Sequence, residues 1–145
     1  EPASGKSVQD RIMDISGLKG RKILICEDNA LNLEIISELL KDQGVLVETA
    51  DNGRLGADKF FASKAGEYQA ILMDIRMPVM DGLAEARAIR QLERADARTV
   101  PILALSANAF DEDIQKSKRA GMNAHLTKPI EPDELYRVLG AMVGK

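Results

Sequence analysis

Short apolar runs recur along the chain, and longer segments with a different hydrophobic period lie between them. The runs cover residues 23–26, 45–49, 70–73, 102–105 and 124–127. Each is short and largely uninterrupted by charge, which is typical of strands buried on both faces of a sheet. The pattern therefore predicts five buried strands.

The intervening segments have apolar residues at helical spacing. In the first of them Leu33, Ile36 and Leu40 lie on one face, and residues 135–142 carry a similar stripe. The residues that separate the predicted elements are Gly44, the run 51–53, Gly66, Pro78, Pro101 and Gly121. Five helices thus alternate with the five strands.

Alternating strands and helices predict an α/β fold in which helices cover both faces of a parallel sheet. For five strands the usual doubly wound, flavodoxin-like order is 2-1-3-4-5. Gly44 and Gly121 stand where a glycine commonly follows the end of a helix. Residues 1–20, which are interrupted by Pro2 and several glycines, are predicted to be a linker, and residues 21–145 the domain.

Composition excludes several classes of function. The 145 residues suit one domain, the net charge is -3 and aromatic residues make up only 3%. A nucleic-acid-binding surface needs clustered cations or stacking aromatics, so we expect no nucleic acid partner. No apolar stretch approaches the ~20 residues of a membrane span, so we expect no membrane contact by this domain.

The single cysteine and the start of the chain bear on its location. Cys26 lies in an apolar run and is predicted to be a small core residue in a reducing compartment. We expect a cytoplasmic domain, although a longer parent protein could be anchored in a membrane. The chain does not begin with Met, and we expect it to be a fragment.

Polar side chains stand at the carboxyl ends of four predicted strands. Strand 1 is followed by Glu27 and Asp28, strand 3 by Asp74, strand 4 by Ser106 and strand 5 by Lys128. In doubly wound sheets, ligands bind outside the carboxyl ends of the strands at the point where strand order reverses. These five side chains are therefore predicted to converge on one crevice.

The chemistry of such a crevice follows from its charges. Three carboxylates at one place repel one another unless a cation binds or a proton is taken up. Oxygen ligands favour a hard ion, and Mg²⁺ suits a site with few carboxylates, with Mn²⁺ as an alternative. Together with the ammonium of Lys128 and the hydroxyl of Ser106, this is equipment for phosphoryl transfer to a carboxylate.

Each of these residues also has an ordinary structural interpretation. Asp28 or Asn29 could cap the next helix, Ser106 could be a loop hydroxyl, and Lys128 could be a solvated surface charge. The combination of suitable residues at four separate strand ends favours the functional interpretation.

At these residues the sequence resembles the receiver domain of two-component response regulators, from about Gly20 to Val143. The resembling segments are 23–29 with the acidic pair, 72–82 with the phosphoacceptor loop, 103–109 with the hydroxyl residue, and 128–129 with the lysine and proline. The loop around Asp74 and the segment around Ser106 look most like receivers of hybrid sensor histidine kinases.

The resemblance implies a role for each site residue. Asp74 would be the phosphorylated nucleophile, and Asp28 and Asp74 would bind Mg²⁺ directly. Glu27 would act on the ion through a water, and the backbone carbonyl of Arg76 would complete the protein ligands.

The residues around the phosphoryl group follow from the same resemblance. Lys128 would contact that group, Ser106 would donate a hydrogen bond to it, and the peptide before Pro129 would be cis. A receiver of this kind catalyses its own phosphorylation and dephosphorylation, while the parent chain would be a histidine kinase.

The sequence departs from the family pattern in places. Glu27 replaces a common Asp, which a longer side chain and a water can accommodate. Arg76 and Asn108 occupy variable positions that flank the phosphoryl group, so they are expected to tune its lifetime. His125 stands where Tyr or Phe often acts as a rotamer switch coupled to Ser106, and a half-exposed strand position is an equal alternative for it.

Partners and output are also implied by the resemblance. The phosphodonor would be the phosphohistidine domain of a histidine kinase, with a separate histidine phosphotransfer domain as a further partner. Phosphorylation would change the shape of one face, which is made by the fourth helix, the fifth strand and the fifth helix. The fourth helix is expected to begin near residues 110–112. We expect no output domain in this sequence, and DNA binding would require one.

Other functions remain open at this point. A stand-alone regulator or a non-phosphorylated docking receiver would have the same fold. A flavodoxin-like electron carrier needs a hydroxyl- and glycine-rich loop for the FMN phosphate, where this chain has Glu27 and Asp28. A phosphohydrolase typically needs a second acid two residues after the nucleophile, where this chain has Arg76.

Overall fold

A computed structural model describes residues 18–77, 79–107 and 111–143. Five strands form one parallel sheet in the order β2-β1-β3-β4-β5, which confirms the predicted fold class and strand order. The strands are β1 (Lys22–Cys26), β2 (Leu46–Ala50), β3 (Tyr68–Asp74), β4 (Ile102–Ser106) and β5 (Ala124–Thr127).

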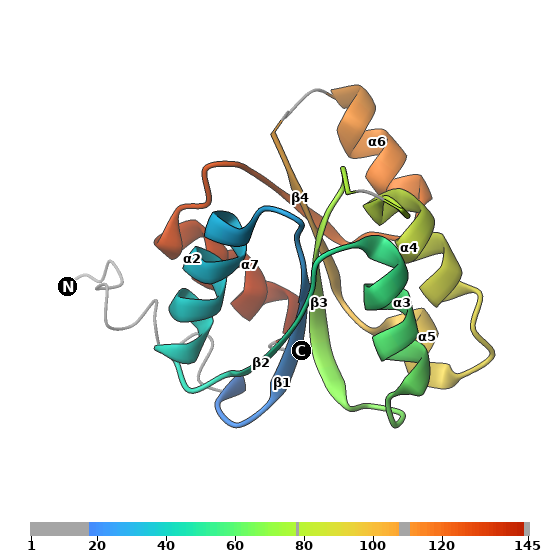
Figure 1. Cartoon of the computed structure of the whole chain (residues 1–145), viewed down its shortest axis with the longest axis horizontal. Helices are drawn as coiled ribbons and strands as arrows, with labels where there is room; N and C mark the ends of the chain where they lie inside the picture. The colour runs from blue at the N-terminus through green and yellow to red at the C-terminus, as the bar shows by residue number, and fades with distance from the viewer. Residues whose placement is uncertain (1–17, 78, 108–110, 144–145) are drawn as a thin grey trace.

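Helices cover both faces of the sheet (Figure 1). They are α2 (Ala30–Lys41), α3 (Gly53–Ala62), α4 (Gly82–Arg90), α5 (Ala95–Thr99), α6 (Asp111–Arg119) and α7 (Pro132–Val143). Helices α2 and α7 pack on one face, where Ile25, Ile36 and Leu139 belong to one buried cluster. The other helices lie on the opposite face, where Phe60 and Ile89 belong to a second cluster. Burial on both faces explains the continuous apolar runs of β1, β3 and β4. The prediction of five buried strands was wrong for β2 and β5, which are the edges of the sheet and are only partly buried.

The described chain has one helix more than predicted. The prediction of five helices was wrong because the connection between β3 and β4 contains two helices, α4 and the short α5. Between them, Arg94 forms an ion pair with Asp96 and donates to the backbone carbonyl of Ser63 at 2.6 Å. These contacts turn the chain at a place where no apolar periodicity marked a new element.

Helices α2, α3 and α4 begin directly after the loops that leave the strands. The side chains of Asn29, Asn52 and Asp81 accept hydrogen bonds from the backbone amides two or three residues into their helices. The cap of α2 is thus Asn29, so Asp28 does not serve as that cap. This leaves the carboxylate of Asp28 available at the end of the sheet.

Two glycines lie in the turns that follow helices, as predicted. Gly44 has a φ of 79° and Gly121 a φ of 100°, which is the left-handed conformation expected after α2 and α6. Leu18, the first described residue, is 1% exposed and packs in the core. The boundary between linker and domain at residues 20 and 21 stays a prediction. Within the described ranges, we find no helix with the length and apolar character that crossing a membrane requires.

Candidate functional site

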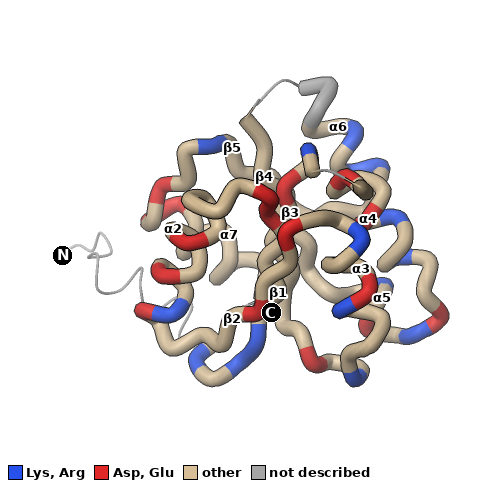
Figure 2. The backbone as a smooth tube through the Cα atoms, viewed as in Figure 1, with Lys and Arg blue, Asp and Glu red and all other residues tan. Residues whose placement is uncertain are grey.

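Three carboxylates meet at the carboxyl ends of two neighbouring strands. Glu27 and Asp28 follow β1, and Asp74 is the last residue of β3. One carboxylate oxygen from each lies within 4.8 Å of the others. Figure 2 shows acidic positions gathered at this end of β1 and β3. The parallel pairing of β1 with β3 brings these residues together, as the sequence predicted.

Lys128 reaches the same place from the loop after β5. Its Nζ lies 2.8 Å from Oε1 of Glu27 and 2.9 Å from Oδ2 of Asp74. The lysine is 54 residues away from Asp74 in the chain. The backbone amide of Lys128 also donates to the carbonyl of Ser106 at 2.7 Å, which ties this loop to the end of β4. One ammonium therefore bridges two buried carboxylates.

Backbone amides fix the orientation of the same carboxylates. The amide of Asn29 donates to Oε2 of Glu27 at 3.1 Å, and the amide of Arg76 donates to Oδ1 of Asp74 at 3.1 Å. Glu27 is fully buried and Asp74 is 5% exposed, whereas Asp28 is exposed. In each buried carboxylate, one oxygen thus accepts a hydrogen bond from a backbone amide and the other forms an ion pair with Lys128.

The site carries more negative charge than its lysine neutralises. Burial raises the pKa of Glu27, and the nearby Asp74 raises it further, while the hydrogen bond from Lys128 acts in the opposite direction. Burial also acts to lower the pKa of Lys128, but Glu27 and Asp74 together outweigh it and the pKa is raised. An all-oxygen donor set with excess negative charge fits a hard divalent cation.

Ser106 and His125 lie on adjacent strands beside this cluster. Ser106 ends β4 and pairs in register with Thr127, while His125 pairs with Ala104. Because side chains alternate along a strand, Ser106 and His125 point to the same face of the sheet, the face that carries α3 to α6. Ser106 is buried and His125 is half-buried.

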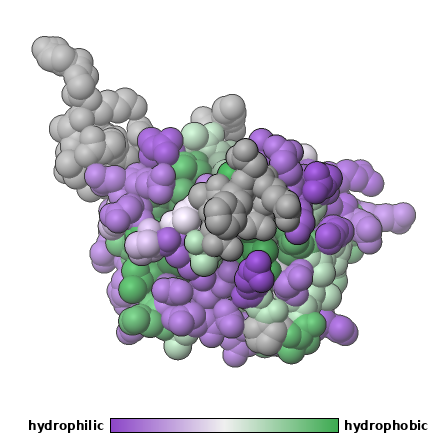
Figure 3. Space-filling model, turned by 90° about the horizontal axis from the view of Figure 1, so that it is seen from above, coloured by the Kyte–Doolittle hydropathy of each residue, from purple (hydrophilic) through white to green (hydrophobic). Residues whose placement is uncertain are grey.

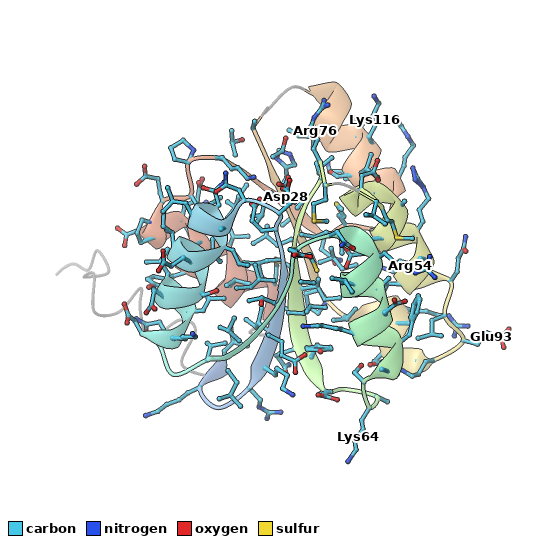
Figure 4. The ribbon with its side chains drawn as sticks, in the orientation of Figure 1. Asp28, Arg54, Lys64, Arg76, Glu93 and Lys116 are labelled. Atoms are coloured by element: carbon cyan, nitrogen blue, oxygen red, sulfur yellow. The ribbon has the colours of Figure 1, made fainter. Side chains whose placement is uncertain are left out.

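Pro129 and Arg76 lie at the same end. The peptide between Lys128 and Pro129 is cis, as predicted. Figure 4 shows Arg76 with Asp28 at the end of the sheet opposite Lys64, and the side chain of Arg76 is exposed. Asn108, which is predicted to tune the lifetime of the phosphoryl group, lies outside the described residues.

Sequence reasoning missed the tight packing around the loop that follows β3. A Cβ on Gly82 would overlap the backbone carbonyl oxygen of Asp74, and a Cβ on Gly53 would overlap the carbonyl oxygen of Met80. The amide of Gly82 also donates to the carbonyl of Ile75 at 2.8 Å. The Asp-Gly pair at 81–82 was the available signal, because glycine permits close backbone approach.

Comparison with known proteins decides the family. Residues 23–139 match the response regulator receiver domain. The chain belongs to this family. The receiver domain so identified covers the five strands except Lys22, α2 to α6, and most of α7.

Among relatives of this receiver domain are hybrid histidine kinases. Hybrid signal transduction histidine kinase I of Dictyostelium discoideum is 36% identical over 137 residues, which cover 92% of this chain and 8% of that protein. The chain therefore corresponds to a small part of the relative.

Two solved structures share the fold. The receiver domain of sensor histidine kinase PA1611 from Pseudomonas aeruginosa, with magnesium coordinated in its active-site cleft, is 38% identical, with a TM-score of 0.78 over 86% of this chain and 98% of that one. The second structure is the receiver domain of Saccharomyces cerevisiae Ssk1, solved with the histidine phosphotransfer protein Ypd1. That match has 27% identity and a TM-score of 0.75 over 86% of this chain and 89% of that chain.

Proposed function

We propose that this receiver domain accepts a phosphoryl group from a phosphohistidine onto Asp74. The observation that carries the proposal is the ammonium of Lys128 placed between Glu27 and Asp74, beside the carboxylate of Asp28. A carboxylate nucleophile, a cation and a further acidic residue are the parts that phosphoryl transfer to an aspartate requires.

The acidic cluster fits Mg²⁺, and Mn²⁺ is an alternative for the same oxygens. Asp28 and Asp74 would hold the ion directly, Glu27 through a water, and Arg76 through its backbone carbonyl. Magnesium supplies charge neutralisation for phosphoryl oxygens when it is bound. The magnesium-bound receiver of PA1611 supports this assignment by analogy.

The chain's own residues then perform the transfer. A carboxylate oxygen of Asp74 forms the new P–O bond while the P–N bond to the donor histidine breaks, and the imidazole nitrogen keeps that electron pair. Lys128 exchanges part of its contact with Asp74 for the phosphoryl oxygens, and Ser106 donates a hydrogen bond to one of them. The exposed side chain of Arg76 lies near the entrance and, with Asn108, tunes access of water to the acyl phosphate. When water attacks the phosphorus, a new P–O bond forms, the P–O bond to Asp74 breaks, and inorganic phosphate leaves while the Asp74 carboxylate is restored, so dephosphorylation is intrinsic to the domain.

The signal would leave through the sheet face that Ser106 and His125 share. If Ser106 moves toward the phosphoryl group, space opens beside β5 on the side of His125, two residues back along the paired strand. Rotation of His125 would then alter the surface made by α6, β5 and α7. Phosphorylation must favour one of these two arrangements to have any effect.

The donor would dock on α2 beside the site. Leu31 and Ile35, one helical turn apart on α2, are 64% and 45% exposed. Ile35 also lines a groove of about 80 Å³ with Lys128 and Ile130, so apolar surface adjoins the phosphoacceptor. Figure 3, which looks onto this end of the molecule, shows apolar patches among polar surface. A helical phosphohistidine domain, from a kinase or a phosphotransfer protein, fits such a surface.

The parent protein is proposed to be a cytoplasmic or membrane-anchored hybrid sensor histidine kinase. The support is the hybrid kinase relative, of which this chain matches only 8%. A stand-alone regulator is the alternative, and the length of the natural polypeptide distinguishes them.

The first experiment is intact mass spectrometry after incubation with acetyl phosphate, with and without Mg²⁺. The expected result is a single Mg²⁺-dependent phosphoryl adduct that disappears in Asp74→Asn. Asp58→Asn, which changes an exposed carboxylate on α3, is the matched control and should keep the adduct. An adduct that persists in Asp74→Asn would show that another residue, and not Asp74, is the nucleophile. Absence of an adduct with both acetyl phosphate and a phosphorylated histidine donor would favour a docking receiver.

A further inference from the structure

A second buried carboxyl group lies outside the phosphoacceptor cluster. Glu85, in the first turn of α4, is fully buried. The thiol of Cys26, at the end of β1, donates to Oε2 of Glu85 at 3.1 Å. The other oxygen, Oε1, has no hydrogen-bond partner among the described residues. A buried acid in this state needs an explanation, because unsatisfied polar groups are costly.

The packing around this carboxyl group has no spare room. A Cβ on Gly56 of α3 would overlap Oε2 of Glu85 and would lie 2.6 Å from Sγ of Cys26. The backbone of α3 therefore rests directly on the carboxyl group and the thiol. Glu85 fills the junction of three elements, β1, α3 and α4.

This junction is joined to the phosphoacceptor loop by short paths. Helix α4 begins at Gly82, whose amide donates a hydrogen bond to the carbonyl of Ile75. The backbone at Gly82 is so close to Asp74 that a Cβ there would overlap the carbonyl oxygen of Asp74. On the other side, Cys26 immediately precedes Glu27. A displacement of the Glu85 carboxyl group would move the start of α4, and with it the loop that follows Asp74.

The charge state of Glu85 is set by its surroundings. Burial raises the pKa of Glu85 to about 8, and the hydrogen bond from the Cys26 thiol lowers it only partly. From β1 the titratable group facing it is this thiol, and α3 presents the backbone at Gly56. Lys59 of α3 influences the thiol through space, but its ammonium donates to the carbonyl of Thr49. Among the described residues, no ion pair involves Glu85.

We propose that Glu85 is a positioning residue that holds the phosphoacceptor loop in place while it is uncharged, and that loss of its proton opens the junction and lowers phosphorylation. The second half rests on the proposed function, since it needs Asp74 to accept a phosphoryl group. The first half is independent of it. The receiver would then respond to alkaline pH through a group that touches neither phosphoryl nor metal.

The size of the response follows from the proton equilibrium. With a pKa of about 8, roughly nine-tenths of the molecules carry the proton at pH 7 and roughly one-tenth at pH 9. If only the protonated form has the loop in place, phosphorylation falls by about tenfold across this range. The folded pKa lies above the unfolded value, so stability from this group is complete below about pH 4.3 and is lost as pH rises through 8.

The decisive comparison is between the native domain and Glu85→Gln, which keeps the shape of the protonated acid. We would measure the initial rate of adduct formation with acetyl phosphate and saturating Mg²⁺ at pH 7 and pH 9. Glu93→Gln, at an exposed glutamate that Figure 4 shows projecting from the molecule, is the matched control. For the native domain, the ratio of the rate at pH 7 to the rate at pH 9 is expected to be about ten times the ratio for Glu85→Gln. Glu93→Gln should have the same ratio as the native domain. Equal ratios in native domain and Glu85→Gln would overturn the proposal.

A second measurement needs no variant and no phosphorylation. Nuclear magnetic resonance of the native domain with ¹³C-labelled glutamate should show one carboxyl group titrating near pH 8, and the amide signal of Gly82 should shift with the same midpoint. If all glutamates titrate near pH 4 to 5, or if the Gly82 amide does not respond, the positioning role is wrong. If Asp74 accepts no phosphoryl group at any pH, the proposed function fails, and the titration still decides the role of Glu85.

Discussion

The two ends of the sheet contain similar charged residues in opposite electrostatic situations. At the carboxyl end, Glu27, Asp28 and Asp74 surround the single ammonium of Lys128. At the amino end, Lys22 lies 2.7 Å from Glu67 at the start of β3, and near α5 Arg94 pairs with Asp96. Lys22 also lies 3.5 Å from Glu48, so two carboxylates share one ammonium there as well. The difference is burial: Glu27 and Asp74 are buried, whereas Glu48 and Glu67 remain partly exposed to water.

The pKa directions follow this difference. Burial raises the pKa of Glu27, whereas the hydrogen bond from Lys22 lowers the pKa of Glu67 and that from Arg94 lowers the pKa of Asp96. The ionised form is therefore costly for Glu27, whereas it is stabilised for Glu67 and Asp96. Such perturbed groups gather at functional sites, because they are retained for chemistry and not for stability.

Packing differs between the same two ends, and a pair of glycines gives the largest expected effect. Gly82→Ala would place a Cβ against the backbone carbonyl of Asp74, which cannot move aside as a side chain can. We expect a loss of about 3 kcal/mol or more in the free energy of unfolding, together with loss of phosphorylation. Gly66, at the amino end, has a φ of 80° and open space around it, so Gly66→Ala should cost only about 1 kcal/mol. Urea denaturation of both variants checks this, and equal losses would contradict the packing difference.

Removal of a lysine should have unequal consequences at the two ends. Lys128→Ala leaves Glu27 and Asp74 facing each other without their shared cation. We expect a destabilisation of about 1–3 kcal/mol in the absence of divalent ions and a phosphorylation rate reduced at least about tenfold. The comparison is Lys22→Ala, which should retain phosphorylation and lose little stability because its carboxylate partners can be hydrated. A normal phosphorylation rate in Lys128→Ala would remove this residue from the mechanism.

Neutralising a carboxylate should stabilise the carboxyl end. Asp74→Asn relieves repulsion with Glu27, so without Mg²⁺ its free energy of unfolding should exceed the native value by about 1 kcal/mol. Mg²⁺ should then raise the melting temperature of the native domain and have a smaller effect on the variant, since bound ligands stabilise the folded state by mass action. Thermal melts with and without Mg²⁺ provide the measurement. A destabilised Asp74→Asn would show that the cluster is not repulsive.

The smallest effect is expected from neutralisation at the amino end. Glu67→Gln removes the nearer of the two carboxylates that pair with Lys22 and should lower stability slightly. The difference should shrink at high salt because the pair is partly exposed to water. The lowered pKa of Glu67 means that its contribution is present above its unfolded pKa and is lost as pH falls through the lower folded value. Denaturation at pH 7 and pH 3 in low and high salt tests both statements. A stabilising effect like that of Asp74→Asn would erase the contrast between the ends.

Much of the fold was determined by local features that a sequence displays directly. Apolar runs located all five strands to within two residues at each boundary, although only β1, β3 and β4 are buried along most of their length. Left-handed backbone after a helix needs glycine, which located the turns at Gly44 and Gly121. The placement of Glu27, Asp74, Ser106 and Lys128 at strand ends followed as well, because parallel topology sends every carboxyl end to the same edge.

Other features depend on contacts between distant segments, and only the tertiary structure decided them. The short helix α5 depends on Arg94, whose partners include Ser63, 31 residues away in the chain. Glu85 would be read as an exposed helical charge, and its burial follows from the absence of a side chain at Gly56, on a different helix. Hydrophobic periodicity reports which residues leave water on average. It contains no information on which polar atom meets which, because that is set by packing across elements at distances of a few ångströms.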